Sequence, residues 1–503
     1  MNPTRNVLSA TMGAMIGCAL SMSNMTPALA QIRRDDTTRT VSATVAINQI
    51  RPPVSQSFMG FSIEWSMIGG LTTREYGRQR ALINLMQQLQ RCNGPMVLRI
   101  GGNSEDEAAY DLPHDHGLPK FVHINITRQT LERLAALARA TRCKFIIGLN
   151  LGVNRPALAV RLVRAAERII GNQHILAFEI GNEIDSLGRF GGIWKHNTFS
   201  LCMRRWNRYA QAIRPYLKST REIAGPAFAG AWDRDIPKFI TLEHRRLCLV
   251  TLHRYPLGAP IKNPKSPAFA SIAHLLGSRA ARAFGPGLMQ RTIAVAARYA
   301  LPVRWGEMNS AYGGGKQGVS STFASALWCA DALFEAADIG AAGVNVHMSE
   351  GFDHFPGAYD PIYFYPHGPL EERPSFYGML LFARSIENHA QIIPVSYHSH
   401  GNVKIWSTRA ADGTIRVVVL NKSLHHPTVV NLRLGTTSRV TVTTLTAPSV
   451  MAVQHVNYGG QSFYGSADGK LRGVRKRTSI PTPGGRIAVP VAPCSAELIC
   501  GAK

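Results

Sequence analysis

Short apolar runs alternate with helix-like stretches between about residues 59 and 386. Runs of this length predict strands buried on both faces, and hydrophobic residues spaced three to four apart predict amphipathic helices. Regular alternation of the two is typical of βαβ units. The predicted strands are Met59–Ile63, Val97–Ile100, Phe145–Leu149, Ile175–Ile180, Glu222–Gly225, Leu249–Leu252, Val303–Trp305 and Gly343–His347. Eight such repeats predict a (β/α)8 barrel.

Two of the intervening helices have recognisable starts. Pro156 suits a first helical position, and the apolar residues between it and Gly171 share one face. Ser320 is predicted to cap another helix, in which apolar residues from Phe323 to Phe334 share a face.

The pattern changes near residue 392, beyond which apolar and polar residues alternate one by one between turn residues. This period of two, without helices, is typical of a β-sandwich. Thr40–Ile47 has the same alternation and is predicted to add an N-terminal strand to it, whereas residues 452–485 are predicted to be loop. The predicted C-terminal strands are Val403–Thr408, Ile415–Leu420, Val429–Leu434, Arg439–Leu445, Arg486–Val491 and Glu497–Ile499.

These patterns divide the 503 residues into four segments. Residues 1–30 are predicted to be a signal peptide, 31–56 carry the N-terminal strand, 57–391 form the catalytic barrel, and 392–503 form the β-sandwich. The fold class is therefore α/β: a TIM barrel with a C-terminal β-sandwich domain that also takes up an N-terminal strand.

The first thirty residues have the features of an export signal. Arg5 supplies the positive charge, Val7–Met22 is apolar, and Ala28–Ala30 offers a cleavage site after Ala30. The expected location is therefore secreted or periplasmic, with no integral membrane span, because no stretch is long and apolar enough for one. Met15–Cys18 also resembles a lipoprotein signal, which leaves lipidation of Cys18 as an alternative.

Charge and cysteine content narrow the classes of partner. Lys and Arg number 56 against 31 Asp and Glu, a net charge of +25, which attracts polyanions in general. No nucleic-acid-binding motif accompanies this charge, so a specific nucleic-acid partner is not expected. No C-x-x-C pair suggests a metal site, and the eight cysteines leave a bridge between Cys494 and Cys500 open.

Two glutamates stand at the predicted mouth of the barrel, where the active sites of such barrels lie. Glu183 follows the fourth strand and Glu307 follows the seventh. Retaining glycosidases need two such carboxylates about 5–5.5 Å apart. Asn182, beside the first glutamate, is placed to hydrogen-bond a sugar 2-hydroxyl, whereas Glu179 lies inside the strand and is predicted to be a structural ion-pair partner.

Four segments carry a resemblance to a known family. Ile180–Glu183, Glu307–Gly315, Leu98–Asn103 and His253–Tyr255 resemble the corresponding motifs of glycoside hydrolase family 79, the β-glucuronidases and heparanases. The likeness runs from about Met59 to Ile386 and extends to the terminal β-sandwich.

The resemblance implies a retaining hydrolase that cleaves β-linked glucuronic acid, either exo-acting or, like heparanase, endo-acting. It implies that Glu183 is the general acid/base, that Glu307 is the nucleophile, and that Tyr255 hydrogen-bonds the nucleophile. The expected partner is a uronic-acid-containing glycoside or an acidic polysaccharide, with no cofactor and no metal; the oligomeric state stays open.

Further residues are candidates for binding the sugar. The Tyr312 hydroxyl and the N–H groups of Gly313 and Gly314 are predicted to bind the C6 carboxylate, since glycine allows close approach of the backbone. Glu64, Asn103 and Tyr359 are expected to bind sugar hydroxyls. The short loop Ser104–Ile126 is expected to close one end of the cleft, which favours exo action.

Two other functions remain open. Another retaining enzyme of the same clan, such as an arabinofuranosidase or a xylosidase, would use the same two glutamates. A non-catalytic protein that binds acidic polysaccharide would use the positive charge alone.

Overall fold

The structure of the chain is a computed structural model that describes residues 38–91, 93–114, 117–190, 194–219, 221–350, 356–399, 401–435 and 438–501. The predicted signal peptide, its cleavage site after Ala30 and Cys18 lie outside the described residues. Within the described ranges, no helix combines the length and apolar character needed to cross a bilayer.

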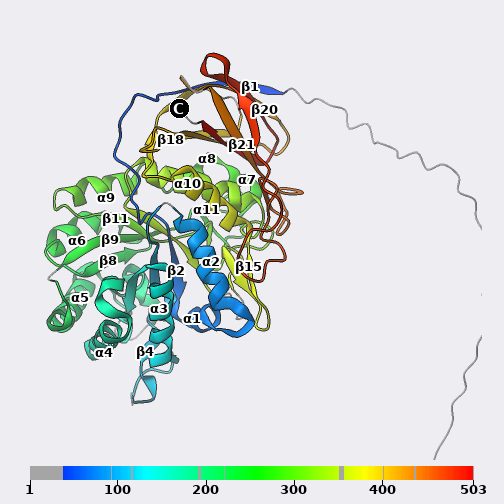
Figure 1. The fold of residues 1–503 in the computed structure, drawn as a ribbon. Helices are drawn as coiled ribbons and strands as arrows, with labels where there is room; N and C mark the ends of the chain where they lie inside the picture. Colours follow the sequence, from blue (N-terminus) through cyan, green and yellow to red (C-terminus); the bar gives the residue numbers. More distant parts are fainter. Residues whose placement is uncertain are drawn as a thin grey trace, which may run out of the picture. The chain divides into compact units, whose positions relative to one another are not determined.

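Eight parallel strands close into a barrel, which confirms the predicted fold (Figure 1). Around the barrel the strand order is β11-β13-β2-β3-β6-β7-β8-β9. The strands are β2 (Gly60–Glu64), β3 (Val97–Gly101), β6 (Lys144–Leu149), β7 (Ile175–Ile180), β8 (Ile223–Phe228), β9 (Leu247–Arg254), β11 (Val303–Met308) and β13 (Gly343–Met348). Almost every residue in them is buried, as their unbroken apolar runs require.

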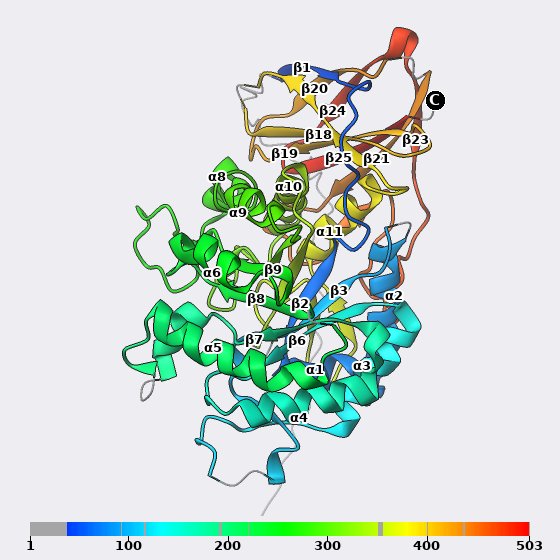
Figure 2. The same ribbon diagram turned by 90° about the vertical axis from the view of Figure 1, so that its left-hand side faces the viewer.

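Helices cover the outside of the barrel, and several are seen side-on in Figure 2. They are α1 (Trp65–Thr72), α2 (Arg78–Gln90), α3 (Arg128–Thr141), α4 (Pro156–Ala166), α5 (Phe199–Ile213), α6 (Ile236–Glu243), α7 (Ile272–Leu276), α8 (Ser278–Arg282), α9 (Leu288–Ala297), α10 (Ala324–Asp338) and α11 (Pro374–Ser385). Helix α4 begins at Pro156, as predicted, and continues as one π-helical turn to Gly171.

The predicted cap at Ser320 is wrong. Helix α10 begins only at Ala324, and the Ser320 hydroxyl instead pairs with Ser310 Oγ at 2.9 Å and accepts from the Lys316 N–H at 3.1 Å. Residues 324–336 of this helix are buried on every side, because the barrel, α11 and the C-terminal sheets all pack around it. A helix without a polar face has no periodicity that marks its first residue.

The C-terminal part contains two packed sheets, ordered β17-β1-β20-β24 and β16-β18-β19-β25-β21-β22, with β23 paired to β21. The N-terminal strand joins the first sheet as predicted, because β1 pairs in parallel with β20 and antiparallel with β17. The strands are β1 (Arg39–Val45), β16 (Gln391–Ile393), β17 (Val395–Tyr397), β18 (Val403–Arg409), β19 (Ile415–Asn421), β20 (Thr428–Arg433), β21 (Arg439–Thr446), β22 (Asn457–Tyr458), β23 (Thr478–Pro481), β24 (Arg486–Val491) and β25 (Ser495–Gly501).

Residues 452–485, predicted to be loop, are mostly irregular but include the short strands β22 and β23. Cys494 and Cys500 are free thiols, so the structure contains no bridge between them.

The sandwich and the barrel share one hydrophobic core. Trp406 and Leu498 of the sandwich belong to the same buried cluster as the helices of the barrel. At this junction the Asp331 carboxylate of α10 accepts from Trp406 Nε1 at 2.9 Å and from Lys422 Nζ at 2.6 Å. The buried carboxylate is thus paired and hydrogen-bonded, which makes its burial tolerable.

Candidate active site

Glu183 lies in a tight turn directly after β7. Gly181 has φ 80°, and a Cβ there would stand 2.6 Å from Ile184 Cγ2, so only glycine fits. Glu183 itself has φ 45°, a left-handed conformation that costs free energy for a non-glycine residue and is found preferentially at functional sites. The turn aims its side chain into the barrel mouth.

Glu307 lies inside β11 rather than beyond its end, because the strand continues to Met308 and not, as predicted, to Trp305. The pairing of β11 shifts between Trp305 and Glu307 against β9, and between Trp305 and Met308 against β13. Such an irregularity re-aims side chains near a barrel rim. The glutamate is therefore held by a strand on each side and has little freedom to move.

The two carboxylates meet across the mouth. One carboxylate oxygen of Glu183, one ring nitrogen of His253 and one carboxylate oxygen of Glu307 all lie within 4.8 Å of one another. His253 Nδ1 stands 3.3 Å from Glu183 Oε1 and 3.9 Å from Glu307 Oε2. The Glu183 side chain is 21% exposed and that of Glu307 6%, so the two face the same opening from different depths.

Glu307 is surrounded by groups that favour its anion. The Tyr255 hydroxyl donates to Oε1 at 2.7 Å, Arg99 Nη1 donates to Oε2 at 2.8 Å, and His347 Nδ1 lies 3.5 Å from Oε2. Burial by itself would raise the pKa of Glu307, but the charges of His347, His253 and Arg99 and the Tyr255 hydrogen bond lower that pKa to about 2. Glu307 is therefore an anion at neutral pH.

Arg99 links several residues at the base of the site through hydrogen bonds. Its fully buried guanidinium donates to Glu179 Oε2 at 2.5 Å, to Asn182 Oδ1 at 2.8 Å and to Ser62 Oγ at 3.1 Å. Burial would lower the pKa of Arg99, but the carboxylates around it raise the pKa above its ordinary value. The predicted structural ion pair of Glu179 is thus confirmed, and it belongs to the same network as Glu307.

A cavity of about 680 Å³ opens over the two carboxylates. Its wall includes most of the predicted sugar-binding residues, but Asn182 is not among the described residues that line it. Asn182 is buried, with its Oδ1 bonded to Arg99 and its Nδ2 3.3 Å from Asn103 Oδ1. The lining residues are Glu64, Ser66, Asn103, Ser104, Glu107, His123, Ile124, Glu183, Tyr255, Glu307, Tyr312, Gly313, Gly314, His347, Ser349, Glu350 and Tyr359.

Glu64 and Tyr359 line the cavity but are already engaged with the protein. The Glu64 carboxylate accepts from the N–H groups of Asn103 at 3.0 Å and Ser104 at 2.8 Å, and from the Ser104 hydroxyl. Tyr359 stacks on Tyr255 with ring centroids 6.1 Å apart, and burial raises the pKa of its hydroxyl well above the usual value. Both residues shape the wall and hold the loops that form it.

The segment after β11 brings backbone donors to the rim of the cavity. Strand β12 (Ala311–Tyr312) pairs with β10 (Leu257–Gly258), and Gly313 and Gly314 follow with φ 80° and 79°. Among the described residues, neither glycine N–H has a hydrogen-bond acceptor. Two free N–H groups and the Tyr312 hydroxyl therefore border the same opening.

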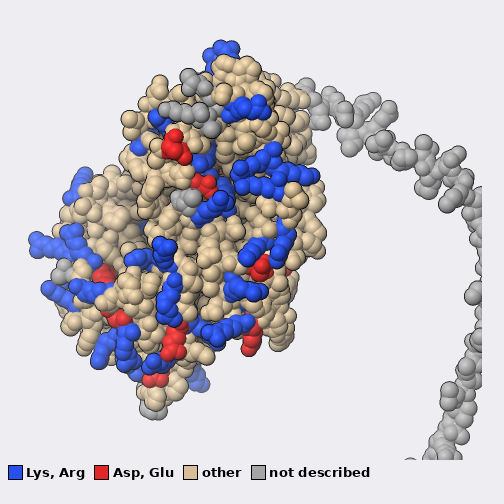
Figure 3. All heavy atoms as spheres, viewed as in Figure 1, with Lys and Arg blue, Asp and Glu red and all other residues tan. Residues whose placement is uncertain are grey.

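The cavity is acidic although the chain is strongly basic. Its lining contains five glutamates and, among the described residues, no Lys or Arg. Figure 3 shows Lys and Arg side chains spread over the barrel and the sandwich on one face, with fewer acidic groups between them. The positive excess of +25 is thus not concentrated at the two carboxylates.

Among the polar residues of the site that received no role from the sequence are Arg99, His253, His347 and His123. The first three share one signal, an ionisable residue inside an otherwise apolar strand. Burial would lower the pKa of His347, but Glu307 and Glu64 raise it above the usual value, so this imidazole carries positive charge more readily than a free one.

Glu183, His253 and Glu307 are close enough to one another to ligate a cation. The Arg99 guanidinium, 2.8 Å from Glu307 Oε2, already supplies positive charge at that carboxylate and would repel a metal ion. Both oxygens of Glu307 also accept hydrogen bonds from protein donors. The donor set therefore fits a reacting carboxylate pair better than a metal centre.

No family model matches the chain. It is 24% identical over 372 residues to a β-glucuronidase of Neurospora crassa and 23% identical over 380 residues to one of Aspergillus niger, which covers 63% and 68% of this chain. The aligned part spans 62% and 66% of the length of those relatives, less than two thirds of each.

Solved structures share the fold. A 4-O-α-L-rhamnosyl-β-D-glucuronidase from Fusarium oxysporum superposes with a TM-score of 0.75 at 19% identity and covers 91% of this chain and 99% of its own. An arabinofuranosidase from Xanthomonas axonopodis pv. citri gives 0.64 at 14% identity, covering 92% and 100%. At these identities the likeness establishes the barrel with its terminal sheet domain and nothing further.

Proposed function

We propose that this protein is a retaining glycoside hydrolase that removes β-linked glucuronic acid and that it is related to the family 79 enzymes. The observation that carries the proposal is the pair of carboxylates at the strand ends, whose nearest oxygens lie within 4.8 Å. That separation suits the retaining reaction, since an inverting pair stands about 6.5–9.5 Å apart to admit a water molecule. The similarity to two fungal β-glucuronidases supports the choice of sugar.

The surroundings of the two glutamates assign different roles to them. Glu307, whose pKa is lowered to about 2, is the nucleophile, because its carboxylate stays ionised and Tyr255 and Arg99 fix its orientation. Glu183, more exposed and beside His253, is the general acid/base.

The reaction proceeds in two displacements. In the first, Glu307 attacks the anomeric carbon while Glu183 gives its proton to the departing glycosidic oxygen, and a glycosyl–enzyme ester forms. In the second, Glu183 takes a proton from a water molecule, the water oxygen attacks the same carbon, and the bond to Glu307 breaks. The sugar leaves with its original anomeric configuration.

Neutral donors recognise the sugar carboxylate in this proposal. The free N–H groups of Gly313 and Gly314 and the Tyr312 hydroxyl border the cavity, and no described lining residue is a Lys or Arg. Backbone N–H groups that bind an anion form charge-assisted hydrogen bonds, which are about twice as strong as neutral ones. A neutral sugar would leave these donors without their intended partner.

The cavity favours a small glucuronide or the end of a chain over the middle of an acidic polymer. Ser104, Glu107, His123 and Ile124, all from the loop after β3, form part of its wall, consistent with the expectation that this loop closes one end. Five lining glutamates would also repel a densely sulfated chain. The proposed action is therefore exo.

A panel of aryl glycosides tests the proposal. The β-glucuronide should be hydrolysed at least about 10³-fold faster, in kcat/KM, than the β-glucoside, because unpaired polar groups in a desolvated site reject an analogue that lacks its partner. Tyr312→Phe should erode that preference by about tenfold, while Tyr464→Phe, an exposed tyrosine outside the cavity, should leave it unchanged. Equal rates on both sugars, or a preference for an arabinofuranoside or xyloside, would overturn the assignment.

A further inference from the structure

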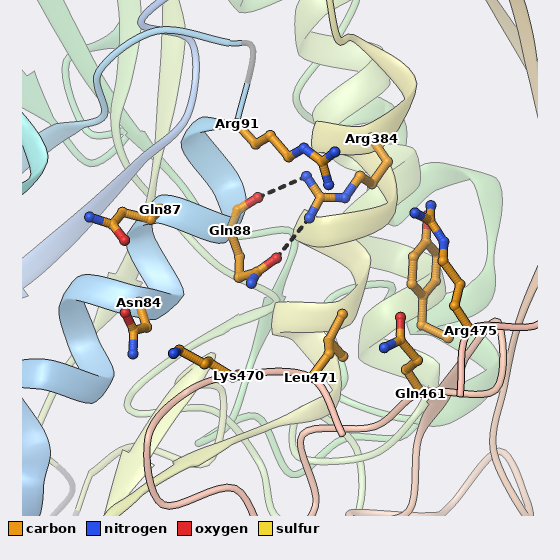
Figure 4. A pocket seen from close by; sticks show the side chains of 10 residues that line it. Asn84, Gln87, Gln88, Arg91, Arg384, Gln461, Lys470, Leu471 and Arg475 are labelled. Carbon is orange, nitrogen blue, oxygen red and sulfur yellow. Dashed lines mark hydrogen bonds between the residues drawn. The ribbon is translucent and has the colours of Figure 1, made fainter. Parts of the chain in front are cut away.

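A second set of pockets lies at the other end of the barrel. Helix α2 ends at Gln90, and its last turn leads towards the start of β3 at Val97, whereas the catalytic cavity lies at the ends of the strands. The last turn of α2, together with Arg91 beyond it and Arg384 of α11, faces the irregular segment between β22 and β23 (Figure 4). A pocket of about 540 Å³ occupies this junction, and one of about 210 Å³ adjoins it.

Both pockets are strongly basic. They share Arg91, Arg384, Arg475 and Tyr458, so they form one continuous site, which we call the basic pocket. Six cationic side chains line it, namely Arg91, Arg384, Arg416, Lys470, Arg475 and Arg477. The single acidic residue in the described lining is Glu387, and Arg384 already pairs with it at 3.2 Å.

At least half of these six charges have no ion-pair partner among the described residues. Among the described residues, Arg91, Arg475 and Arg477 have no carboxylate within ion-pair distance. Partial burial lowers the pKa of Arg475, and the like charges of Arg477, Arg384 and Arg91 lower it further. Like charges gathered at one pocket repel each other, which an anion bound between them would relieve.

The buried hydroxyl of Tyr458 is a second, independent feature that points to a ligand. Its side chain is 3% exposed, it lines both pockets, and its hydroxyl has no hydrogen-bond partner among the described residues. A buried hydroxyl without a partner costs about 1–3 kcal/mol, so such groups are rare unless something else satisfies them. The hydroxyl can donate to an anion held by the surrounding arginines.

The walls of the basic pocket are held in place before any ligand arrives. Arg384 donates from Nη1 to the Gln88 carbonyl at 3.1 Å and from Nη2 to Gln88 Oε1 at 2.8 Å, so its guanidinium is fixed against α2. The opposite wall is folded by paired backbone bonds between Ser462 and Arg472 at 2.9 and 2.8 Å. A preformed site loses less entropy on binding.

We propose that the basic pocket binds an acidic oligosaccharide through its carboxylate or sulfate groups, at the end of the barrel opposite to the catalytic cavity. The amide side chains of Asn84, Gln87 and Gln461 line the same pocket and suit sugar hydroxyls. The choice of a saccharide rests on the proposed function, whereas the binding of an anion rests on the arginines and Tyr458. The basic pocket then binds an acidic oligosaccharide that the acidic catalytic cavity itself does not attract.

Calorimetric titration with a heparin-derived tetrasaccharide tests this proposal, with maltotetraose as the neutral probe and sodium sulfate as the simple anion. The tetrasaccharide should bind, and the double variant Arg91→Gln/Arg475→Gln should weaken binding by at least about tenfold through loss of two charged donors. Arg298→Gln, an exposed arginine of the barrel outside the pocket, is the matched control and should bind as the wild type does.

A second variant, Tyr458→Phe, separates an effect on binding from an effect on folding. It removes only the unpartnered hydroxyl, so the melting temperature without ligand should not fall, while the affinity for the tetrasaccharide should fall several-fold. All these variants should keep wild-type kcat/KM on aryl β-glucuronide, since none of them touches the catalytic cavity.

Three results would overturn the inference: equal affinity of the wild type and the double variant, binding of maltotetraose as tight as that of the tetrasaccharide, or sulfate binding as tight as that of the tetrasaccharide. The proposed function fails separately, by absence of aryl glucuronide hydrolysis. Hydrolysis without tetrasaccharide binding would contradict the basic pocket alone, and binding without hydrolysis would contradict the enzyme alone.

Discussion

The two ends of the barrel have opposite electrostatic character. At the ends of the strands, five glutamates and no described Lys or Arg line the catalytic cavity; the described lining of the basic pocket has six Lys and Arg residues and a single glutamate. Inside the cavity wall the positive charge of Arg99 is fully buried and paired, whereas Arg91 and Arg475 are exposed. A net charge of +25 therefore says little about the charge at the site of chemistry.

The difference in charge suits the two ends of the barrel to different tasks. Chemistry needs an ionised nucleophile and a proton donor, which the cavity supplies through short-range contacts that salt cannot screen. Recruitment of a polyanion needs an accessible positive field, which the basic pocket supplies. The predictions that follow test each end without disturbing the other.

Loss of the nucleophile should have the largest effect. Glu307→Gln should lower kcat on aryl β-glucuronide by roughly 10⁴-fold, because no covalent route remains. In Glu183→Ala, azide should restore cleavage of an activated aryl glucuronide and give a glucuronyl azide of retained configuration. Steady-state kinetics and proton NMR measure both. A glucuronyl azide of retained configuration from the Glu307 variant, together with one of inverted configuration from the Glu183 variant, would reverse the two roles.

Removal of the buried cation should rank next. Arg99→Met should lower the free energy of unfolding by about 3–5 kcal/mol, because the buried Glu179 would lose its ion-pair partner and Glu307 would lose one of the cations that stabilise its anion. Arg128→Met, which breaks the exposed pair with Glu132 at 2.7 Å, should cost less than about 1 kcal/mol. Urea denaturation measures both. A similar decrease in the free energy of unfolding for the two variants would mean that the ion pairs of Arg99 do not stabilise the site.

The barrel strands were predictable because a strand that is buried on both faces appears in the sequence as a short apolar run. The bulge that extends β11 to Met308 was not, because it depends on pairing with β9 and β13. Glu183 and Glu307 could be identified because each follows a short apolar run in the sequence, although Glu307 lies inside β11. The salt bridge of Arg99 to Glu307 and the approach of His347 could not, because they form only when the barrel closes.

The basic pocket was beyond the reach of the sequence for a similar reason. Arg91, Arg384 and Arg475 come from α2, α11 and the segment predicted to be loop, and no local pattern links them. The sequence revealed the positive excess but not where it gathers. A protein with dispersed charges and a protein with clustered charges can have the same amino-acid composition.

Acid should weaken the protein through Glu307. Its folded-state pKa of about 2 lies below the ordinary value of 4.5, so the native state binds this proton less readily than the unfolded chain does. The resulting stability is present above about pH 4.5 and is lost as the pH falls towards 2. Urea unfolding at pH 5 and pH 3 should show a smaller decrease in Glu307→Gln than in the wild type. Glu132→Gln, an exposed carboxylate, should behave like the wild type; an identical pH dependence in all three would contradict the low pKa.

Salt should have the smallest effect on catalysis. The kcat/KM for aryl β-glucuronide should change by less than about twofold between low and physiological ionic strength, because no described Lys or Arg lines the cavity. The affinity for the tetrasaccharide should fall markedly over the same range, and that dependence should flatten in Arg91→Gln/Arg475→Gln. Equally steep dependence for both would mean that the positive field acts on the catalytic cavity as well.

Trapping of the covalent intermediate tests the central claim most directly. A 2-deoxy-2-fluoroglucuronyl fluoride should inactivate the enzyme, and mass spectrometry of the digested protein should place one fluoroglucuronyl group on the peptide that contains Glu307, with slow release in water. A label on the Glu183 peptide, or no adduct together with an inverted product anomer, would contradict the retaining mechanism and the roles given to the two glutamates.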